Sequence, residues 1–198
     1  MTDAGAPDDV AVAMAALDRR TFLPPDQRAH ADEDRPLPIG LGQTCSQPAT
    51  VAAMLRLLDV PAGARVLDVG AGSGWTTAIL ARLVGPRGSV LGVELEPELA
   101  ARAAESLARW RMPWAQVRAA SPGVLGWPRP GGYDRILCSA APSELPTALV
   151  DQLADGGRLV MPVGEAMSRV ERRGDVVHRS THGLYRFVPL RDRPQGPT

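Results

Sequence analysis

Hydrophobic residues recur at helical spacing near the start of the chain and then give way to proline. Val10, Met14 and Leu17 fall at i, i+4 and i+7, the period of one face of an amphipathic helix. Two aspartates precede this pattern and can cap its first turn. Between residues 22 and 40 the prolines are so dense that we predict an extended segment without helix.

In the middle of the chain, short apolar runs alternate with stretches of helical period. The expected strands are Arg65–Val69, Ser89–Val93, Arg135–Cys138 and Arg158–Met161. The expected helices cover Pro48–Leu58, Thr76–Leu83, Leu99–Trp110 and Leu145–Leu153. Strands that alternate with helices form a parallel sheet with helices on both faces. The pattern therefore predicts a doubly wound, Rossmann-like α/β fold.

The rhythm changes after Ser168. Val170, Val176–Val177 and Tyr185–Val188 have the composition of strands, with turns expected at Gly174 and Gly183. We predict that they form an antiparallel edge of the sheet. The whole chain, 1–198, is expected to be one domain, with an N-terminal helix and extension over 10–43, a ligand-binding core over 44–163 and a β edge over 168–190.

Composition and charge mainly exclude functions. The chain has 198 residues, with 22 basic and 22 acidic side chains and 44% hydrophobic residues. It can bury a core, and its zero net charge argues against binding nucleic acid or a membrane surface through bulk charge. Two cysteines and three histidines supply neither a disulfide framework nor a dense metal site. With no long apolar run and an acidic N-terminus, we expect a cytoplasmic monomer without membrane span or metal.

The most informative stretch is Val66–Gly74, where an expected strand runs into a glycine-rich turn that opens a helix. Gly70, Gly72 and Gly74 remove every second Cβ, so a ligand can approach the backbone closely. Glu94 ends the next strand, 20 residues after Gly74. A carboxylate there can accept hydrogen bonds from both ribose hydroxyls of an adenosine cofactor.

The glycine spacing separates two classes of cofactor. Dinucleotide sites use Gly-x-Gly-x-x-Gly, with pyrophosphate at the helix N-terminus. Here the third glycine comes one residue early, Trp75 stands where that pattern has glycine, and Asp68 would repel a pyrophosphate. Asp68 suits the cationic groups of S-adenosylmethionine, which we predict as the cofactor. The alternative is a tight turn that needs glycine and binds nothing.

Four further segments, separated along the chain and in the expected order, resemble the protein-L-isoaspartate O-methyltransferases. They are Leu37–Pro48 (LPIGLGQTCSQP), Tyr133–Ile136 (YDRI), Gly156–Gly164 (GGRLVMPVG) and Phe187–Leu190 (FVPL). Together with the glycine-rich turn, the resemblance covers about residues 10–190. It implies a methyltransferase fold with an S-adenosylmethionine-binding core. The implied reaction esterifies the free α-carboxylate of isoaspartyl residues in damaged proteins and peptides, which lets them return to normal aspartate.

The resemblance also implies roles for individual residues. Ser46 is expected to be the catalytic residue and to bind substrate together with Arg186, and Glu94 is expected to hold the ribose. The full set of expected cofactor-binding residues is Gln43, Thr44, Cys45, Ser46, Asp68, Gly70, Ala71, Gly72, Ser73, Gly74, Glu94, Leu95, Pro122 and Gly123.

One departure from the family concerns the adenine. Ser121-Pro122-Gly123 stand where the family usually has Gly-Asp-Gly, whose Asp binds the adenine amino group. Proline has no side-chain acceptor and no backbone N–H. Loss of the contact should weaken cofactor binding by about 1–3 kcal/mol unless Ser121 or a carbonyl substitutes.

Alternatives stay open at this point. Ser46 precedes Pro48 by two residues and could cap the following helix, and Arg186 could be a solvated charge on an edge strand. The same fold could methylate another carboxylate in a specific peptide. Relatives of that kind usually carry an extra C-terminal region, and this chain ends eight residues after Leu190. It could also be a degenerate, non-catalytic homologue that has lost its cofactor.

Overall fold

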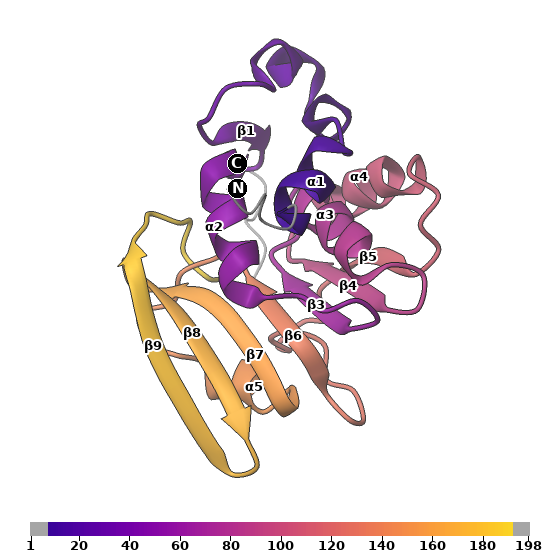
Figure 1. Cartoon of the computed structure of the whole chain (residues 1–198). Coiled ribbons are helices and arrows are strands. Elements are labelled where there is room, and N and C mark those ends of the chain that lie inside the picture. Colours follow the sequence, from indigo (N-terminus) through magenta and orange to yellow (C-terminus); the bar gives the residue numbers. More distant parts are fainter. Residues whose placement is uncertain (1–7, 192–198) are drawn as a thin grey trace, which may run out of the picture.

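The computed structural model describes residues 8–191 (Figure 1). The large sheet contains β3 (Arg65–Val69), β4 (Ser89–Glu94), β5 (Ala115–Ala119), β6 (Tyr133–Cys138), β7 (Leu153–Val163), β8 (Ala166–Arg173) and β9 (Val176–Leu184). A separate hairpin consists of β1 (Leu37–Gly40) and β2 (Gln43–Cys45). The α-helices are α1 (Asp9–Ala15), α2 (Pro48–Leu58), α3 (Trp75–Val84), α4 (Pro97–Ala108) and α5 (Thr147–Val150), and the 3₁₀ helices are η1 (Arg19–Phe22) and η2 (Pro25–His30).

The strand order of the large sheet is β5-β4-β3-β6-β7-β8-β9. The strands from β3 to β7 are parallel, and β8 and β9 are antiparallel to their neighbours. This confirms the predicted α/β sheet with an antiparallel edge. The chain runs outward from β3 to β5 and then returns to β6, so the order reverses between β3 and β6. Ligands of open α/β sheets bind at such a reversal, beyond the carboxyl ends of the strands.

The two faces of the sheet are covered unequally. Helices α1 to α4 pack on one face, over side chains such as Val66 and Leu137. The other face is covered by α5 and the loop before β6, over side chains such as Leu67 and Ile136. Side chains alternate between the faces of a strand, so neighbouring residues enter different cores. The central strands are therefore apolar almost throughout.

The N-terminal prediction is confirmed for α1 and wrong for part of the segment that follows. The Oδ1 atom of Asp8 accepts a hydrogen bond from the backbone N–H of Val10, at 3.1 Å, and caps α1. In the proline-dense segment, however, Pro25–His30 forms η2. Proline is compatible with the first turn of a helix because that turn needs no backbone donor there.

Three predictions in the second half of the chain are corrected. The helix expected over Leu145–Leu153 shrinks to the four residues of α5, since Pro146 precedes it and β7 begins at Leu153. No strand forms over Tyr185–Val188. Gly183, expected in a turn, lies inside β9 with φ +78°, where the register against β8 shifts. An extra residue in one strand is a β-bulge, which glycine accommodates.

Strand β5 has no counterpart in the sequence prediction. Only Val117 among its five residues is buried, because β5 lies at the edge of the sheet. Its sequence, AQVRA, does alternate apolar and polar residues, but two of its three apolar residues are alanines, which have a low strand propensity, so the pattern is a weak strand signal.

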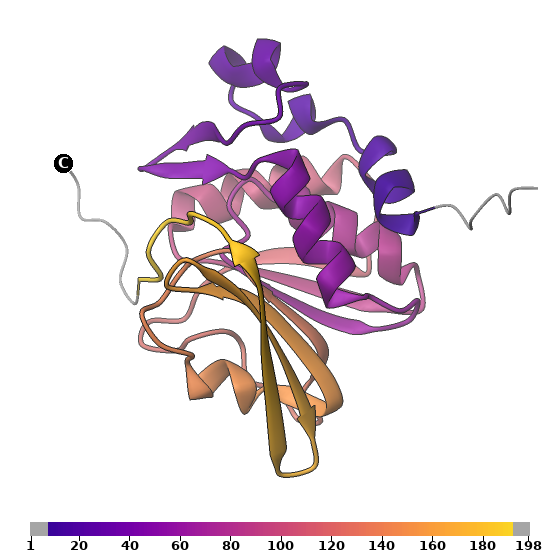
Figure 2. The same cartoon turned by 60° about the vertical axis from the view of Figure 1, so that its left-hand side comes forward.

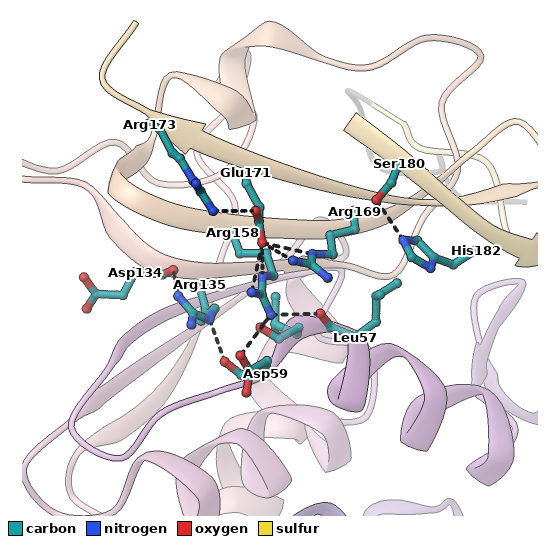
Figure 3. A network of polar contacts seen from close by, with 11 residues as sticks. Leu57, Asp59, Asp134, Arg135, Arg158, Arg169, Glu171, Arg173, Ser180 and His182 are labelled. Atoms are coloured by element: carbon teal, nitrogen blue, oxygen red, sulfur yellow. Dashed lines mark hydrogen bonds and ion pairs between the residues drawn. The ribbon is translucent and has the colours of Figure 1, made fainter. Parts of the chain in front are cut away.

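The C-terminal end of α2 is tied to the sheet by arginines (Figure 3). Arg158 on β7 donates to the carbonyls of Leu57 and Leu58, both at 3.3 Å, and pairs with Asp59 and Glu171. Arg135 on β6 donates to the carbonyl of Asp59 at 2.8 Å. Cations stabilise the negative, C-terminal end of a helix dipole. These contacts therefore fix the C-terminal end of α2.

The β8–β9 hairpin extends beyond the rest of the sheet (Figures 1 and 2), and β9 is exposed along its length. Within residues 8–191, no helix has both the length and the apolar composition to cross a membrane. In the same range, no three side chains of the metal-binding types come together.

Candidate active site and cofactor cavity

A cavity of about 610 Å³ opens where the strand order reverses, at the carboxyl ends of β3, β4 and β6. Its lining comes from segments far apart in sequence: β2 and residue 46, the loop after β3, the end of β4, the loop at 120–126, residues 139–140 and the segment 186–191. The volume lies in the range of about 300–1,000 Å³ that small-molecule sites occupy. The fold thus places one ligand-sized cavity at the position predicted from the glycine-rich turn.

The three glycines of the turn have different tasks. Gly72 has φ +55°, lines the cavity and donates its backbone N–H to Glu94. Gly74 has φ +84° and does not line the cavity. A Cβ on Gly74 would lie 3.1 Å from the carbonyl oxygen of Ala103, so this glycine permits the close approach of α3 to α4.

Gly74→Ala should therefore destabilise the protein even without a ligand. Placing an L-residue at positive φ costs about 1–2 kcal/mol, and the clash with Ala103 adds to that cost. Gly63→Ala is a matched control, because Gly63 has φ +83° and no atom within 4 Å of its Cβ position. Urea unfolding should show a larger loss for Gly74→Ala. Equal losses would mean that the helix contact does not matter.

Glu94 is held by the backbone in an orientation that leaves acceptor capacity. It is buried, and it lines the cavity. Its Oε2 accepts from the N–H of Gly72 at 2.7 Å, and its Oε1 accepts from the N–H of Glu96 at 3.0 Å. A carboxylate oxygen has two lone pairs, so each oxygen can accept one further hydrogen bond from a ligand hydroxyl.

Asp68 occupies a different place from the one expected. It is fully buried and is not among the residues that line the cavity. Its Oδ2 accepts from the Thr77 hydroxyl at 2.6 Å, and within residues 8–191 its Oδ1 has no hydrogen-bond partner. Burial raises the pKa of Asp68 to about 7, against the lowering effect of Thr77, and the charge of Glu94 raises it further. Any influence of Asp68 on a ligand acts through the loop above it.

Ser46 lies between β2 and α2 and lines the cavity. The N-cap of α2 is Gln47, and the capping hydrogen bond comes from Asp34, whose Oδ1 accepts from the N–H of Ala49 at 2.9 Å. Within the described chain, the hydroxyl of Ser46 forms no hydrogen bond that would support a capping role. It is available to a ligand in the cavity.

The departure at Pro122 is a turn that places its neighbours in the cavity wall. The N–H of Val124 donates to the carbonyl of Ser121 at 3.1 Å, and Gly123 has φ +72°. Proline followed by glycine at positive φ is typical of a type II turn. Pro122 is exposed and outside the lining, whereas Ser121 and Gly123 line the cavity. Ser121 is therefore the side chain placed to supply a polar contact in place of the missing carboxylate.

The C-terminal segment forms another wall of the cavity. Ala141 holds it through two backbone hydrogen bonds, to the carbonyl of Val188 at 2.9 Å and from the N–H of Leu190 at 3.0 Å. Arg186 lines the cavity and is exposed. Arg191 pairs with the buried carboxylate of Glu96 at 2.8 Å, close in sequence to Glu94.

The structure brings most of the expected site residues together. Those that line the cavity are Gln43, Thr44, Cys45, Ser46, Gly70, Ala71, Gly72, Ser73, Glu94, Leu95, Gly123 and Arg186. Asp68, Gly74 and Pro122 do not. The lining also includes Thr50, Thr76, Ser139 and Phe187, which were not expected as site residues, although Phe187 begins one of the family-like segments. Ser139 directly follows β6, so its place at the end of a parallel strand was a usable signal.

Comparison with known proteins gives the same family for nearly the whole chain. The family described as protein-L-isoaspartate(D-aspartate) O-methyltransferase (PCMT) matches residues 2–195. The protein-L-isoaspartate O-methyltransferase of Anaeromyxobacter dehalogenans strain 2CP-1 is 49% identical over 189 residues, which cover 92% of this chain and 88% of the relative. That of Aeropyrum pernix is 45% identical, covering 90% of this chain and 70% of the relative.

Solved structures agree. The crystal structure of a protein-L-isoaspartate O-methyltransferase from Plasmodium falciparum, in complex with S-adenosyl-L-homocysteine, superposes with a TM-score of 0.80 at 26% identity and covers 94% of this chain and 91% of that one. The match of fold and sequence extends over almost the full length. This chain belongs to the protein-L-isoaspartate O-methyltransferase family.

Proposed function

We propose that this protein transfers a methyl group from S-adenosylmethionine to the free α-carboxylate of L-isoaspartyl residues in damaged proteins and peptides. The observation that carries the proposal is the juxtaposition of Ser46 with the Gly70–Ser73 loop and Glu94 around one cavity. Family membership supports the same reaction. A nicotinamide or flavin dinucleotide is disfavoured by the glycine spacing.

The residues around the cavity fit S-adenosylmethionine. Glu94 has acceptor capacity left on both oxygens for the ribose hydroxyls, and the loop at Gly70–Ser73 lines the same space. Ser121 and Gly123 line the cavity and are the proposed contacts for the adenine. When bound, S-adenosylmethionine would supply a methyl group on a sulfonium sulfur, and the electron pair of the S–CH₃ bond would stay on sulfur as the carboxylate oxygen forms the O–CH₃ bond.

The chain's own residues have little proton chemistry to perform. The substrate carboxylate is already ionised near pH 7, so it needs no general base. What the protein contributes is alignment and exclusion of water, which together can supply up to about 7–11 kcal/mol. Ser46 donates a hydrogen bond that orients the carboxylate, and Arg186 attracts it from the rim of the cavity.

The proposal also covers the partners, the oligomeric state and the cellular location of the protein. The substrates are isoaspartyl-containing proteins and peptides, and neither nucleic acid nor a membrane is involved. The zero net charge supports this view. We propose that the protein acts in the cytoplasm as a monomer.

The test is transfer of labelled methyl groups from S-adenosylmethionine to an isoaspartyl peptide and to its normal aspartyl twin. We expect labelling of the isoaspartyl peptide alone. Equal labelling of both would indicate a methyltransferase for another carboxylate. Calorimetry with S-adenosylhomocysteine tests whether the protein is a degenerate homologue that has lost its cofactor. Such a homologue would show no saturable binding at millimolar ligand, whereas we expect saturable binding.

Ser46→Ala should slow methylation by roughly 10- to 150-fold, because a hydrogen bond to a charged group contributes about 1.5–3 kcal/mol. The affinity for S-adenosylhomocysteine should stay nearly unchanged, since the lost bond is made to the substrate. Ser180→Ala on the exposed strand β9 is the control. An unaltered rate in Ser46→Ala would remove Ser46 from the active site.

A further inference from the structure

Arg19 is an almost fully buried arginine whose guanidinium joins separate segments of the chain. It is 5% exposed, at the start of η1. Within residues 8–191 it forms five hydrogen bonds, all to backbone carbonyls: Nη1 donates to Ala31 (3.3 Å) and Glu33 (3.0 Å), and Nη2 donates to Arg35 (3.0 Å), Cys45 (3.2 Å) and Ser46 (2.9 Å). A planar guanidinium can serve such dispersed acceptors, whereas an ammonium on a flexible stem cannot.

The segment that Arg19 holds is the wall of the cavity that carries Ser46. Asp34, which lies among the acceptor residues, accepts from the N–H of Ala49 at 2.9 Å and from the side chain of Gln47 at 3.0 Å. The backbone hydrogen bond from Ala49, followed by Gln47 and the charge of Arg19, lowers the pKa of Asp34. Arg19 and Asp34 thus fix the backbone on both sides of Gln47. The remote end of α2 is fixed independently by Arg158 and Arg135 (Figure 3).

The other side of Arg19 faces the cofactor loop. Its Cζ lies 5.2 Å from the ring centroid of Trp75, the first residue of α3, in a cation–π contact. Trp75 directly follows Gly74, the last residue of the glycine-rich turn. One guanidinium therefore touches both the helix that follows the cofactor loop and the carbonyl of Ser46.

We infer that Arg19 is a positioning residue for methyl transfer, which acts through Ser46 by setting its place relative to the Gly70–Gly74 loop. This inference rests on the proposed function. A reaction that depends on alignment is sensitive to such a residue, because a displacement of about 1 Å can cost about 100-fold in rate. Arg19 does not line the cavity, so it contacts neither substrate nor cofactor.

The test is a double-mutant cycle between Arg19→Lys and Ser46→Ala, with rates expressed per binding site for S-adenosylhomocysteine. Lysine keeps the charge but cannot reach five carbonyls. We expect Arg19→Lys alone to lower kcat roughly 10- to 100-fold with the Kd for S-adenosylhomocysteine within about threefold of the wild type. In the Ser46→Ala background the same change should lower kcat less than about threefold, since the group that Arg19 positions is gone.

Binding of an isoaspartyl peptide to the complex with S-adenosylhomocysteine gives a readout independent of turnover. Calorimetry should show weaker peptide binding in Arg19→Lys, and no further weakening in the double variant. Arg20→Lys is the matched control, because Arg20 is the next residue of η1 and its side chain, 47% exposed, forms surface ion pairs with Asp18 and Asp32. It should behave as the wild type.

The outcomes separate the two proposals. A wild type that labels no isoaspartyl peptide overturns the proposed function and this inference with it. A wild type that does so, together with an Arg19→Lys variant of unchanged kcat or with multiplicative effects in the double variant, overturns the inference alone. If Arg19→Lys does not fold, Trp75→Phe replaces it in the test, because this change weakens the cation–π contact of Arg19 with Trp75. Trp75→Phe should lower kcat when Ser46 is present and leave it nearly unchanged in the Ser46→Ala background.

Discussion

Glu94→Ala should raise the Kd for S-adenosylhomocysteine at least about 100-fold. The carboxylate accepts from Gly72 and Glu96 and keeps one acceptor position on each oxygen. Two hydrogen bonds from ribose hydroxyls to a charged group contribute about 1.5–3 kcal/mol each. Their joint loss of about 3 kcal/mol or more corresponds to more than about 100-fold in affinity. Isothermal titration calorimetry measures this directly.

The control for Glu94 must separate lost contacts from lost structure. Removal of the carboxylate leaves the N–H groups of Gly72 and Glu96 without their acceptor, so the thermal midpoint will fall as well. Titration well below that midpoint, with circular dichroism to establish folding, isolates the binding effect. Glu98→Ala on the exposed first turn of α4 should leave the Kd unchanged. A Kd within threefold of wild type for Glu94→Ala would contradict its assignment to the ribose.

Asp68→Asn should remove a large pH dependence of stability. The pKa of Asp68 is raised from 3.8 to about 7, mainly because the carboxyl is buried. Between these values the folded protein holds a proton that the unfolded chain has released, so stability falls as pH rises. The free energy of unfolding of the wild type, relative to Asp68→Asn, should drop by about 4 kcal/mol between pH 4 and pH 7 and then level off.

The sign of this effect distinguishes it from an ordinary ion pair. Asp134 has its pKa lowered, first by the hydrogen bond from Arg65, with Nη2 to Oδ1 at 2.7 Å. The stability that Asp134 contributes is present above its unfolded pKa and is lost as pH falls. The free energy of unfolding of the wild type, relative to Asp134→Asn, should therefore decrease as pH falls, which is the opposite trend. Denaturant unfolding of both variants across pH 3–8 is the measurement. A flat difference for Asp68→Asn would mean that Asp68 stays ionised when buried.

The sequence was a good guide where its pattern is local. The strand at residues 65–69, the glycine-rich turn and the carboxylate at the end of the next strand are all read from adjacent residues, and the structure has them in place. The sequence prediction missed one strand and made one helix too long, because in both places contacts with the rest of the sheet determine the secondary structure. Strand β5 has only Val117 buried, and the expected helix at Leu145–Leu153 is reduced to α5, because Pro146 precedes it and β7 begins at Leu153.

Glycine spacing illustrates the same limit within the site. The pattern singled out Gly70, Gly72 and Gly74 alike, but only the first two line the cavity, and Gly74 serves the contact of α3 with α4. Likewise, Asp68 was expected to face a cationic ligand, yet it is fully buried and hydrogen-bonded to Thr77. Asp68 lies within β3, and which residues of a strand and its following turn face a cavity depends on the packing of the sheet and helices, not on residue type alone.

The amino-acid sequence by itself determined the central alternation of strands and helices, the class of cofactor and the family, because each follows from periodicity, glycine spacing or short motifs. Only the tertiary structure decided which of those residues share a cavity, that Asp34 rather than Ser46 caps α2, and that Arg19 reaches the carbonyl of Ser46. The physical reason is that the two hydrogen bonds join residues 15 and 27 positions apart and the cavity joins segments still farther apart, so their formation depends on packing that no local pattern encodes.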